Sequence, residues 1–200
     1  NAGTRIIKLH HDLESHRREV HRFNAEMSIT NDRLAEANVK LHLVATTDEL
    51  TGLLNRRESI IRMEDHWSAS LRHGDPFACI LLDIDHFRSV NESHGNRAGD
   101  EVLQRIADLV RSVLRKEDML VRYGGEQFLV MLPEVPGPGA VVVAGRIRKA
   151  VEAQPLEAGG VALPVTVSVG VSARMDEGPE SIESLLARAD AALKLAKQRG

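Results

Sequence analysis

Two consecutive glycines, Gly124 and Gly125, separate two short apolar runs in the second half of the chain. The runs at 119–121 and 128–132 both read as strands, and glycine adopts the positive-φ conformations of tight turns without strain. The pattern predicts a β-hairpin with its turn at the two glycines. Such a turn lets an anion approach the backbone, and Glu126 beside it is placed to share a divalent cation with a phosphate. An ordinary hairpin followed by a solvated carboxylate is the alternative.

A longer apolar run, Phe77 to Ile84, predicts a central strand that is buried on both faces. The acids Asp83 and Asp85 mark its end. Carboxylates at the end of a buried strand are costly unless they are solvated or hold a positive charge, so we expect a cation site there. The alternative is that these acids only cap the following helix.

Residues 6–44 contain neither glycine nor proline, and apolar residues recur at every seventh position. This spacing predicts a parallel coiled coil of about 58 Å, and hence a homodimer; a lone amphipathic helix is the alternative. His16 and Thr30 interrupt the seam, as polar residues that set register or oligomeric state do. The two seam positions are Ile6, Leu13, Val20, Met27, Leu34 and Leu41, and Leu9, His16, Phe23, Thr30, Ala37 and Val44.

Composition limits the partners of the chain. The 200 residues are 42% hydrophobic with a net charge of −3, which fits one core with an appended helix and indicates neither nucleic acid nor a membrane surface as a partner. The only cysteine, Cys79, lies in an apolar run, so we expect a buried thiol and a reducing, cytoplasmic location. Because the sequence starts at Asn1 without a methionine, we expect a piece of a longer protein, in which a membrane anchor could lie upstream.

The remaining elements are expected from apolar periodicity and from the positions of glycine and proline. A helix should start near Asn55 and end near Arg72, and residues 90–100 should form two short turns around glycines. Further helices are expected at 100–114, 140–152 and 181–198, and two short strands at 161–171, split at Pro164.

Residues 122–128, Arg-Tyr-Gly-Gly-Glu-Gln-Phe, resemble the signature of the GGDEF family, the bacterial diguanylate cyclases, which usually read Gly-Gly-Asp/Glu-Glu-Phe. Residues 48–57 resemble a second family motif, Asp-x-Leu-Thr-Gly-Leu-x-Asn-Arg-Arg. One departure is Gln127, where the family has an acid. The resemblance covers 45–200 and implies an α/β fold (an α+β sandwich) whose central sheet is flanked by helices, as in nucleotidyl-cyclase and polymerase palm domains. We therefore expect a coiled-coil signalling helix at 1–46 and a GGDEF domain at 47–200.

The resemblance also implies the metal site. Asp83, the backbone carbonyl of Ile84 and Glu126 match the positions that bind Mg²⁺ (or Mn²⁺), and Asp83, Glu126 and Gln127 occupy the catalytic positions. A change from Glu to Gln keeps the shape and removes a charge. We therefore expect Gln127 to weaken a second metal or the handling of protons, and to leave nucleotide binding largely intact.

Further matches concern GTP. One carboxylate can accept both N1–H and N2–H₂ of guanine while an amide complements the remaining edge, and Asn91 and Asp100 match the guanine-reading positions. By itself, Asp100 also fits a helix N-cap. The other substrate-binding matches are His86, Phe87 and Arg88 near the terminal phosphates, Gly124 and Gly125 in the turn, and Lys197 at the triphosphate.

Arg115 and Asp118 form an Arg-x-x-Asp pair nine residues before Gly124. A cluster of charges at a helix end is the plain interpretation. In the family, this position holds the inhibitory site for the product cyclic di-GMP, and Arg146 aligns with a further arginine that some members contribute from a neighbouring domain.

The implied reaction condenses two GTP molecules into cyclic di-GMP with loss of two pyrophosphates, as the output of a bacterial signalling protein. Each domain would hold one GTP, so the reaction would require the dimer that the coiled coil provides. Two alternatives remain. Gln127 could belong to an impaired domain that binds GTP or cyclic di-GMP as a receptor, or the chain could be a dimerisation module without a nucleotide.

Overall fold

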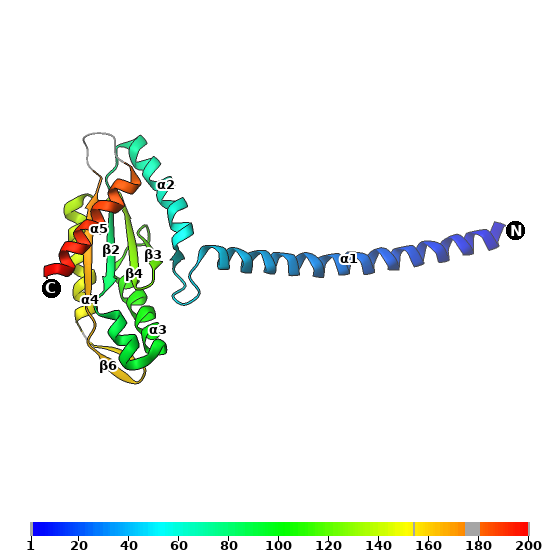
Figure 1. The fold of residues 1–200 in the computed structure, drawn as a ribbon. Helices are drawn as coiled ribbons and strands as arrows, with labels where there is room; N and C mark the ends of the chain where they lie inside the picture. The colour runs from blue at the N-terminus through cyan, green and yellow to red at the C-terminus, as the bar shows by residue number, and fades with distance from the viewer. Residues whose placement is uncertain (1, 154, 175–180, 200) are drawn as a thin grey trace. The chain divides into compact units, whose positions relative to one another are not determined.

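The computed structural model describes residues 2–153, 155–174 and 181–199. The backbone divides into two compact units, Asn1–Ala45 and Thr46–Gly200. The first unit is helical, and the second contains all the strands (Figure 1). Within the described residues, none of the helices combines the length and the apolar character that crossing a membrane requires.

The helix α1, Ala2–Thr46, is continuous over 45 residues, so the prediction of one long N-terminal helix is confirmed. Among the side chains that the structure describes, the seam residues from Val20 to Val44 lie exposed on it, with Phe23 at 63% and Leu41 at 67% accessibility. A helix that buries none of its apolar stripe gains little stability from packing. At the seam interruption Thr30, the hydroxyl donates to the carbonyl of Glu26 at 2.8 Å, so its polar group is satisfied within the helix.

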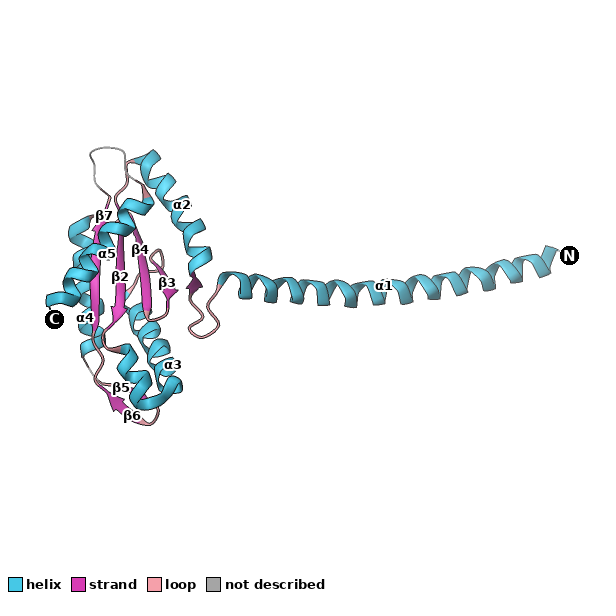
Figure 2. Ribbon diagram, in the orientation of Figure 1, coloured by secondary structure: helices cyan, strands magenta, loops and turns pink. Residues whose placement is uncertain are grey.

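A five-stranded sheet in the order β1-β3-β4-β2-β7 forms the centre of the second unit. Its strands are β1 (Leu54–Asn55), β2 (Phe77–Ile84), β3 (Met119–Gly124), β4 (Gln127–Pro133) and β7 (Val167–Ala173). β1 pairs in parallel with β3, and the other neighbours are antiparallel. All eight residues of β2 are buried, which confirms the predicted central strand. The short strands β5 (Leu156–Ala158) and β6 (Val161–Leu163) form a separate sheet (Figure 2).

Helices cover both faces of the five-stranded sheet, which confirms the predicted fold class. They are α2 (Arg56–His73), α3 (Phe87–Val113), α4 (Gly137–Glu152) and α5 (Ile182–Arg199). Because side chains alternate along a strand, Ile80 and Leu82 pack with α3 and α4, while Cys79 and Leu81 pack with α2 and α5. Cys79 is fully buried, as expected.

Three predictions about helices were wrong. The segment 90–100 is not a pair of turns but part of α3, which is interrupted by non-helical geometry at Gly95 (φ 82°, ψ 160°). Asp100 therefore lies inside a helix and is not an N-cap. The helix α4 begins at Gly137 rather than at 140, because proline near a helix start loses no hydrogen bond.

The second unit is tightly packed where α5 crosses β7. A Cβ atom added at Gly170 would lie 2.1 Å from the carbonyl oxygen of Ala189 and 2.4 Å from the backbone nitrogen of Leu193. Both are backbone atoms of α5, so no side-chain rotation can relieve the clash. Glycine at this position sets how close α5 comes to the sheet.

We predict that Gly170→Ala lowers the free energy of unfolding by at least about 2 kcal/mol, because α5 must move away from β7. Urea denaturation followed by circular dichroism measures this loss. Gly145→Ala on α4 is the matched control, since a Cβ there meets nothing within 4 Å. The control should be neutral or stabilising by up to about 1 kcal/mol, and equal stability of the two variants would contradict the packing argument.

Candidate active site

The end of β2 and the β3–β4 hairpin meet in the centre of the sheet. Asp83 on β2 is the register partner of Gln127 on β4. One residue further on, the amide of Ile84 donates to the carbonyl of Glu126 at 3.3 Å. The two segments that were expected to share a cation are thus neighbours, although 43 residues separate Asp83 from Glu126 in the sequence.

The hairpin turn lies one residue later than predicted. Gly124 is the last residue of β3, and Gly125 and Glu126 form the turn. Only Gly125 has a positive φ, 51°, and the register shifts between Arg122 and Gly124, as a β-bulge at Tyr123 does. A Cβ atom would meet nothing within 4 Å at Gly124 or Gly125, so the backbone here is open to an approaching group.

The carboxylate of Asp83 is the most enclosed charge of this region. The residue is 4% exposed, and two side chains donate to it. Lys197 on α5 places its ammonium nitrogen 2.5 Å from Oδ1, and the amide nitrogen of Gln127 lies 2.9 Å from Oδ2. Three predicted site residues therefore come together from β2, β4 and α5.

Arg122 joins the hairpin to the segment that precedes α2. Its Nη1 lies 3.0 Å from both carboxylate oxygens of Asp48, and its Nε and Nη2 donate to the carbonyl of Gly125. Asp48 also accepts hydrogen bonds from the amide and the hydroxyl of Thr51, which close the turn with Gly52 at φ 64°. The motif at 48–57 and the hairpin thus form one hydrogen-bonded unit.

Sequence reasoning missed this role of Asp48 and Arg122, although both residues lie inside the two family motifs. Burial raises the pKa of the Asp48 carboxyl, but the hydrogen bonds from Thr51 and Arg122 outweigh burial and lower its pKa below the ordinary 3.8. The ionised carboxylate is therefore part of the folded structure.

A second missed group surrounds Asp85. The hydroxyl of Thr166 donates to one of its oxygens at 2.8 Å, and that of Ser168 donates to the other at 2.7 Å. These contacts tie the end of β2 to β7. The Thr-x-Ser-x-Gly spacing signalled them, because alternate residues of a strand share a face.

The break at Gly95 brings the two parts of α3 together. A Cβ atom at Gly99 would lie 1.9 Å from the side-chain oxygen of Asn91 and 3.2 Å from the ring of Phe87. The side chain of Asn91 therefore lies directly over Gly99, next in sequence to the exposed Asp100. The predicted guanine-reading residues Asn91 and Asp100 thus lie on the two parts of α3, on either side of the break at Gly95. Arg88, which is expected near the phosphates, pairs with Glu92 on the surface at 2.7 Å.

The residues predicted for an inhibitory site also converge, at the end of α3. The carboxylate of Asp118 accepts the backbone amide of Arg115 at 2.8 Å, and Arg146 on α4 donates to the carbonyl of Val113 at 2.9 Å. Arg146 thus reaches the turn within its own chain.

The residues around Asp83 fit a hard divalent cation. Mg²⁺ and Mn²⁺ prefer oxygen ligands, and the expected set is two carboxylates and a backbone carbonyl. The observation that carries the fit is the enclosed Asp83 carboxylate, which requires positive charge and has it from Lys197. In the described part of the chain, no group of three or more His, Cys, Asp or Glu side chains is arranged to hold a metal.

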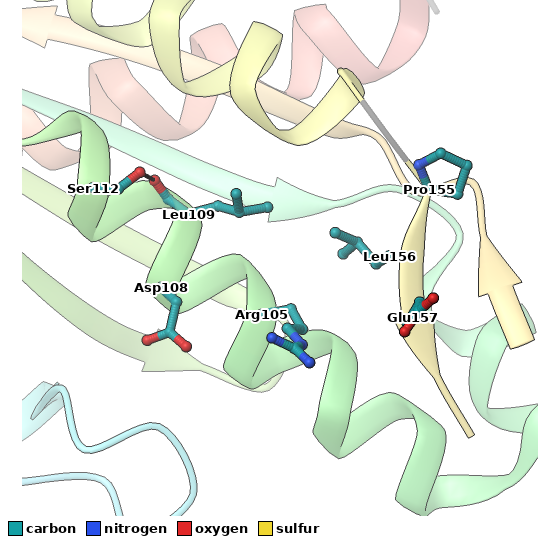
Figure 3. A pocket seen from close by; sticks show the side chains of 7 residues that line it. All are labelled: Arg105, Asp108, Leu109, Ser112, Pro155, Leu156 and Glu157. Atoms are coloured by element: carbon teal, nitrogen blue, oxygen red, sulfur yellow. Dashed lines mark hydrogen bonds between the residues drawn. The ribbon is translucent and has the colours of Figure 1, made fainter. Parts of the chain in front are cut away.

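A pocket of about 420 Å³ lies elsewhere, between α3 and β5 (Figure 3). It is lined by Arg105, Asp108, Leu109, Ser112, Pro155, Leu156 and Glu157, and none of these is a predicted site residue. This pocket is therefore separate from the residues that the sequence predicts for the site.

Together, a sheet flanked by helices and an acidic strand end beside a glycine turn define a nucleotidyl-cyclase-like domain. Residues 45–200 match the model of the GGDEF family, described as "Diguanylate cyclase, GGDEF domain". The chain belongs to this family.

Relatives agree with this assignment. The chain is 40% identical over 159 residues to the response regulator PleD of Caulobacter vibrioides, which covers 78% of this chain and 35% of PleD. The coiled coil and GGDEF domain of DgcB from Caulobacter crescentus, solved with c-di-GMP, superimposes with a TM-score of 0.81 at 30% identity, covering 88% of this chain and 93% of that one. Diguanylate cyclase SiaD of Pseudomonas aeruginosa, solved with its activator SiaC, has a TM-score of 0.74 at 34% identity, covering 100% and 76%. The chain spans less than half the length of the curated relatives it matches.

We predict that the Asp48–Arg122 contact stabilises the domain only above the folded-state pKa of Asp48. Because this pKa is depressed, the ionised carboxylate contributes stability above pH 3.8, and the contribution is lost as the pH falls through the folded-state value. Asp48→Asn should cost roughly 1 to 2 kcal/mol at neutral pH, since the pair is partly solvated.

Urea unfolding of the parent and of Asp48→Asn between pH 3 and 7 measures this contribution. The difference between the two proteins should be constant at neutral pH and shrink below about pH 4. A difference that stays unchanged down to pH 3 would show that the ion pair contributes no pH-dependent stability.

Proposed function

We propose that this chain is the output part of a diguanylate cyclase, which joins two GTP molecules into cyclic di-GMP and releases two pyrophosphates. The observation that supports it is the convergence of Asp83, the Gly125–Glu126 turn and Lys197, with oxygen ligands and a cationic side chain around one open backbone. The family assignment supplies the class of reaction.

Each group has a proposed role. Asp83, Glu126 and the Ile84 carbonyl would hold Mg²⁺ or Mn²⁺. When bound, this ion would lower the pKa of the attacking ribose 3′-hydroxyl and offset charge on the α-phosphate. Lys197 and the turn around Gly125 would orient the triphosphate. A bond would then form between the 3′-oxygen of one GTP and the α-phosphorus of the other, as the bond from that phosphorus to pyrophosphate breaks and the hydroxyl proton passes to water. The same exchange in the opposite direction would close the ring and release the second pyrophosphate.

Base recognition is assigned to the two parts of α3. Asp100 would accept the N1–H and N2–H₂ donors of guanine, and Asn91 would complement the remaining edge. Gly99 supports this role, because its missing side chain leaves room for the side chain of Asn91 against the backbone that leads to Asp100. Adenine lacks this pair of adjacent donors, so the same arrangement selects against ATP.

One domain holds half of the reacting pair, so we propose that α1 forms a coiled-coil homodimer with a second copy. Six heptads of apolar side chains support this, since Val20, Phe23, Leu34 and Leu41 are all more than half exposed on the helix. A paired helix would raise the effective concentration of one GTP-loaded domain for the other.

A second candidate function is that of a cyclic di-GMP receptor. It is supported by Gln127 and by the residues predicted for the inhibitory site. The amide of Gln127 removes a charge that other family members carry, while Arg115, Asp118 and Arg146 are gathered at one end of α3. A domain with this combination would bind cyclic di-GMP at the Arg-x-x-Asp turn as a receptor, or be inhibited by it as a product.

Incubation with GTP and Mg²⁺, followed by chromatography of the nucleotides, separates these functions. We expect the parent chain to form cyclic di-GMP and Gln127→Glu to form it faster. Glu126→Ala should lower turnover by about 100-fold, because a ligand that stabilises transition-state charge is lost.

If neither the parent nor Gln127→Glu forms product but both bind cyclic di-GMP, and Arg115→Ala abolishes that binding, the receptor function replaces the cyclase. If Glu126→Ala also leaves binding of GTP with Mg²⁺ unchanged, the nucleotide site is wrongly assigned. The chain is then a dimerisation module.

Substituting charged residues into the apolar seam of α1 tests the proposed dimer. Leu34→Asp together with Leu41→Asp should give a monomer in analytical ultracentrifugation and reduce turnover at least tenfold at low protein concentration. Val39→Asp with Ile29→Asp is the matched control, because both residues are exposed apolar positions outside the seam. A dimer that survives the seam substitutions would exclude the coiled coil as its cause.

A further inference from the structure

The proposed metal ligand Asp83 already has a counter-ion inside the protein. Lys197 contacts Oδ1 at 2.5 Å and Gln127 contacts Oδ2 at 2.9 Å, so each carboxylate oxygen accepts one donor from a different element. The side chain of Asp83 is 6% exposed, whereas the side chain of Lys197 is 42% exposed. The carboxylate is therefore fixed in the interior, while the lysine reaches it from the surface and can leave.

An enclosed carboxylate needs a compensating charge, and this site offers two sources. The ammonium of Lys197 provides the charge in the structure described here. A divalent cation on Asp83 would provide it instead, and would repel an ammonium so close by. The two cations therefore compete for the same carboxylate.

We propose that Lys197 is the exchangeable counter-ion of Asp83 in the nucleotide-free protein, and that it gives way to the divalent cation as the triphosphate arrives and accepts the ammonium. This inference rests on the proposed function and adds an order of events to it. The cation alone binds weakly, because it must displace Lys197 into water. The cation and the triphosphate bind cooperatively. The cation frees the ammonium of Lys197 for the triphosphate, and the triphosphate accepts the ammonium that the cation would otherwise displace into water.

Gln127 is a positioning residue in this exchange. Its amide donates to Oδ2 of Asp83 and holds the carboxylate in one orientation whichever cation is present. A glutamate at this position would place a second carboxylate against Asp83, and that pair requires a further cation or a proton. Gln127 thus adapts the site to one positive partner at a time.

The experiment measures Mn²⁺ affinity by calorimetry and by electron paramagnetic resonance, without nucleotide and with a non-hydrolysable GTP analogue. We expect Lys197→Met to bind Mn²⁺ alone at least tenfold more tightly than the parent and to lose the cooperativity with the analogue. Lys197→Arg should restore part of the parent behaviour. Lys194→Met is the matched control, because Lys194 lies on the same helix and pairs with Asp190 at 2.6 Å.

Thermal unfolding gives a second readout that needs no activity. In EDTA, Lys197→Met should unfold several degrees below the parent, because Asp83 loses its counter-ion, and Mn²⁺ should restore more stability to this variant than to the parent. Gln127→Glu should show the same pattern, with two carboxylates facing each other. If Lys197→Met does not fold, Lys197→Gln keeps the test decisive, because it removes the charge and retains a donor for Asp83.

Equal Mn²⁺ affinities in Lys197→Met, Lys194→Met and the parent would overturn the exchange. The proposed function is judged separately by product formation in the parent chain. If the parent forms product but Lys197→Met binds Mn²⁺ without nucleotide no more tightly than the parent, only this inference is wrong. If Lys197→Met binds Mn²⁺ more tightly but the parent forms no product, only the proposed cyclase activity is wrong.

Discussion

The enclosed carboxylate of Asp83 is the constraint around which the second unit is built. A charge at 4% exposure on a strand buried at every residue is stable only with donors on both oxygens, and β4 and α5 supply them through Gln127 and Lys197. This requirement fixes which side chains must face β2. The helix that carries Lys197 also lies close to the sheet at Gly170, where a Cβ atom would meet the backbone of α5.

Arg122 plays the corresponding part on the other side of the hairpin. It holds the carboxylate of Asp48 through one nitrogen and the Gly125 carbonyl through two others. The turn of the proposed nucleotide site is thereby hydrogen-bonded to the segment that starts the second unit.

How far the sequence could predict the structure depended on the range of the interactions involved. The strand at Phe77 to Ile84 was predicted because eight consecutive buried residues leave an apolar run, and the start of α2 because Asn55 caps the amide of Glu58 locally. The hairpin turn was placed one residue early because either glycine can adopt the positive φ of a turn. The bulge that places Gly125 in the turn arises from the pairing of β3 with β4. Gly95 and Gly99 were interpreted as turns because the contact between Asn91 and Gly99 is not local.

The sequence by itself determined the long helix, the central strand and the family, since periodicity, apolar runs and ordered motifs are properties of short segments. Only the tertiary structure decided which charged side chains pair. Strand order and helix packing bring Lys197 to Asp83 across 114 residues and Arg122 to Asp48 across 74. The physical reason is that a buried charge selects its partner by proximity in the folded chain, and no local pattern encodes that proximity.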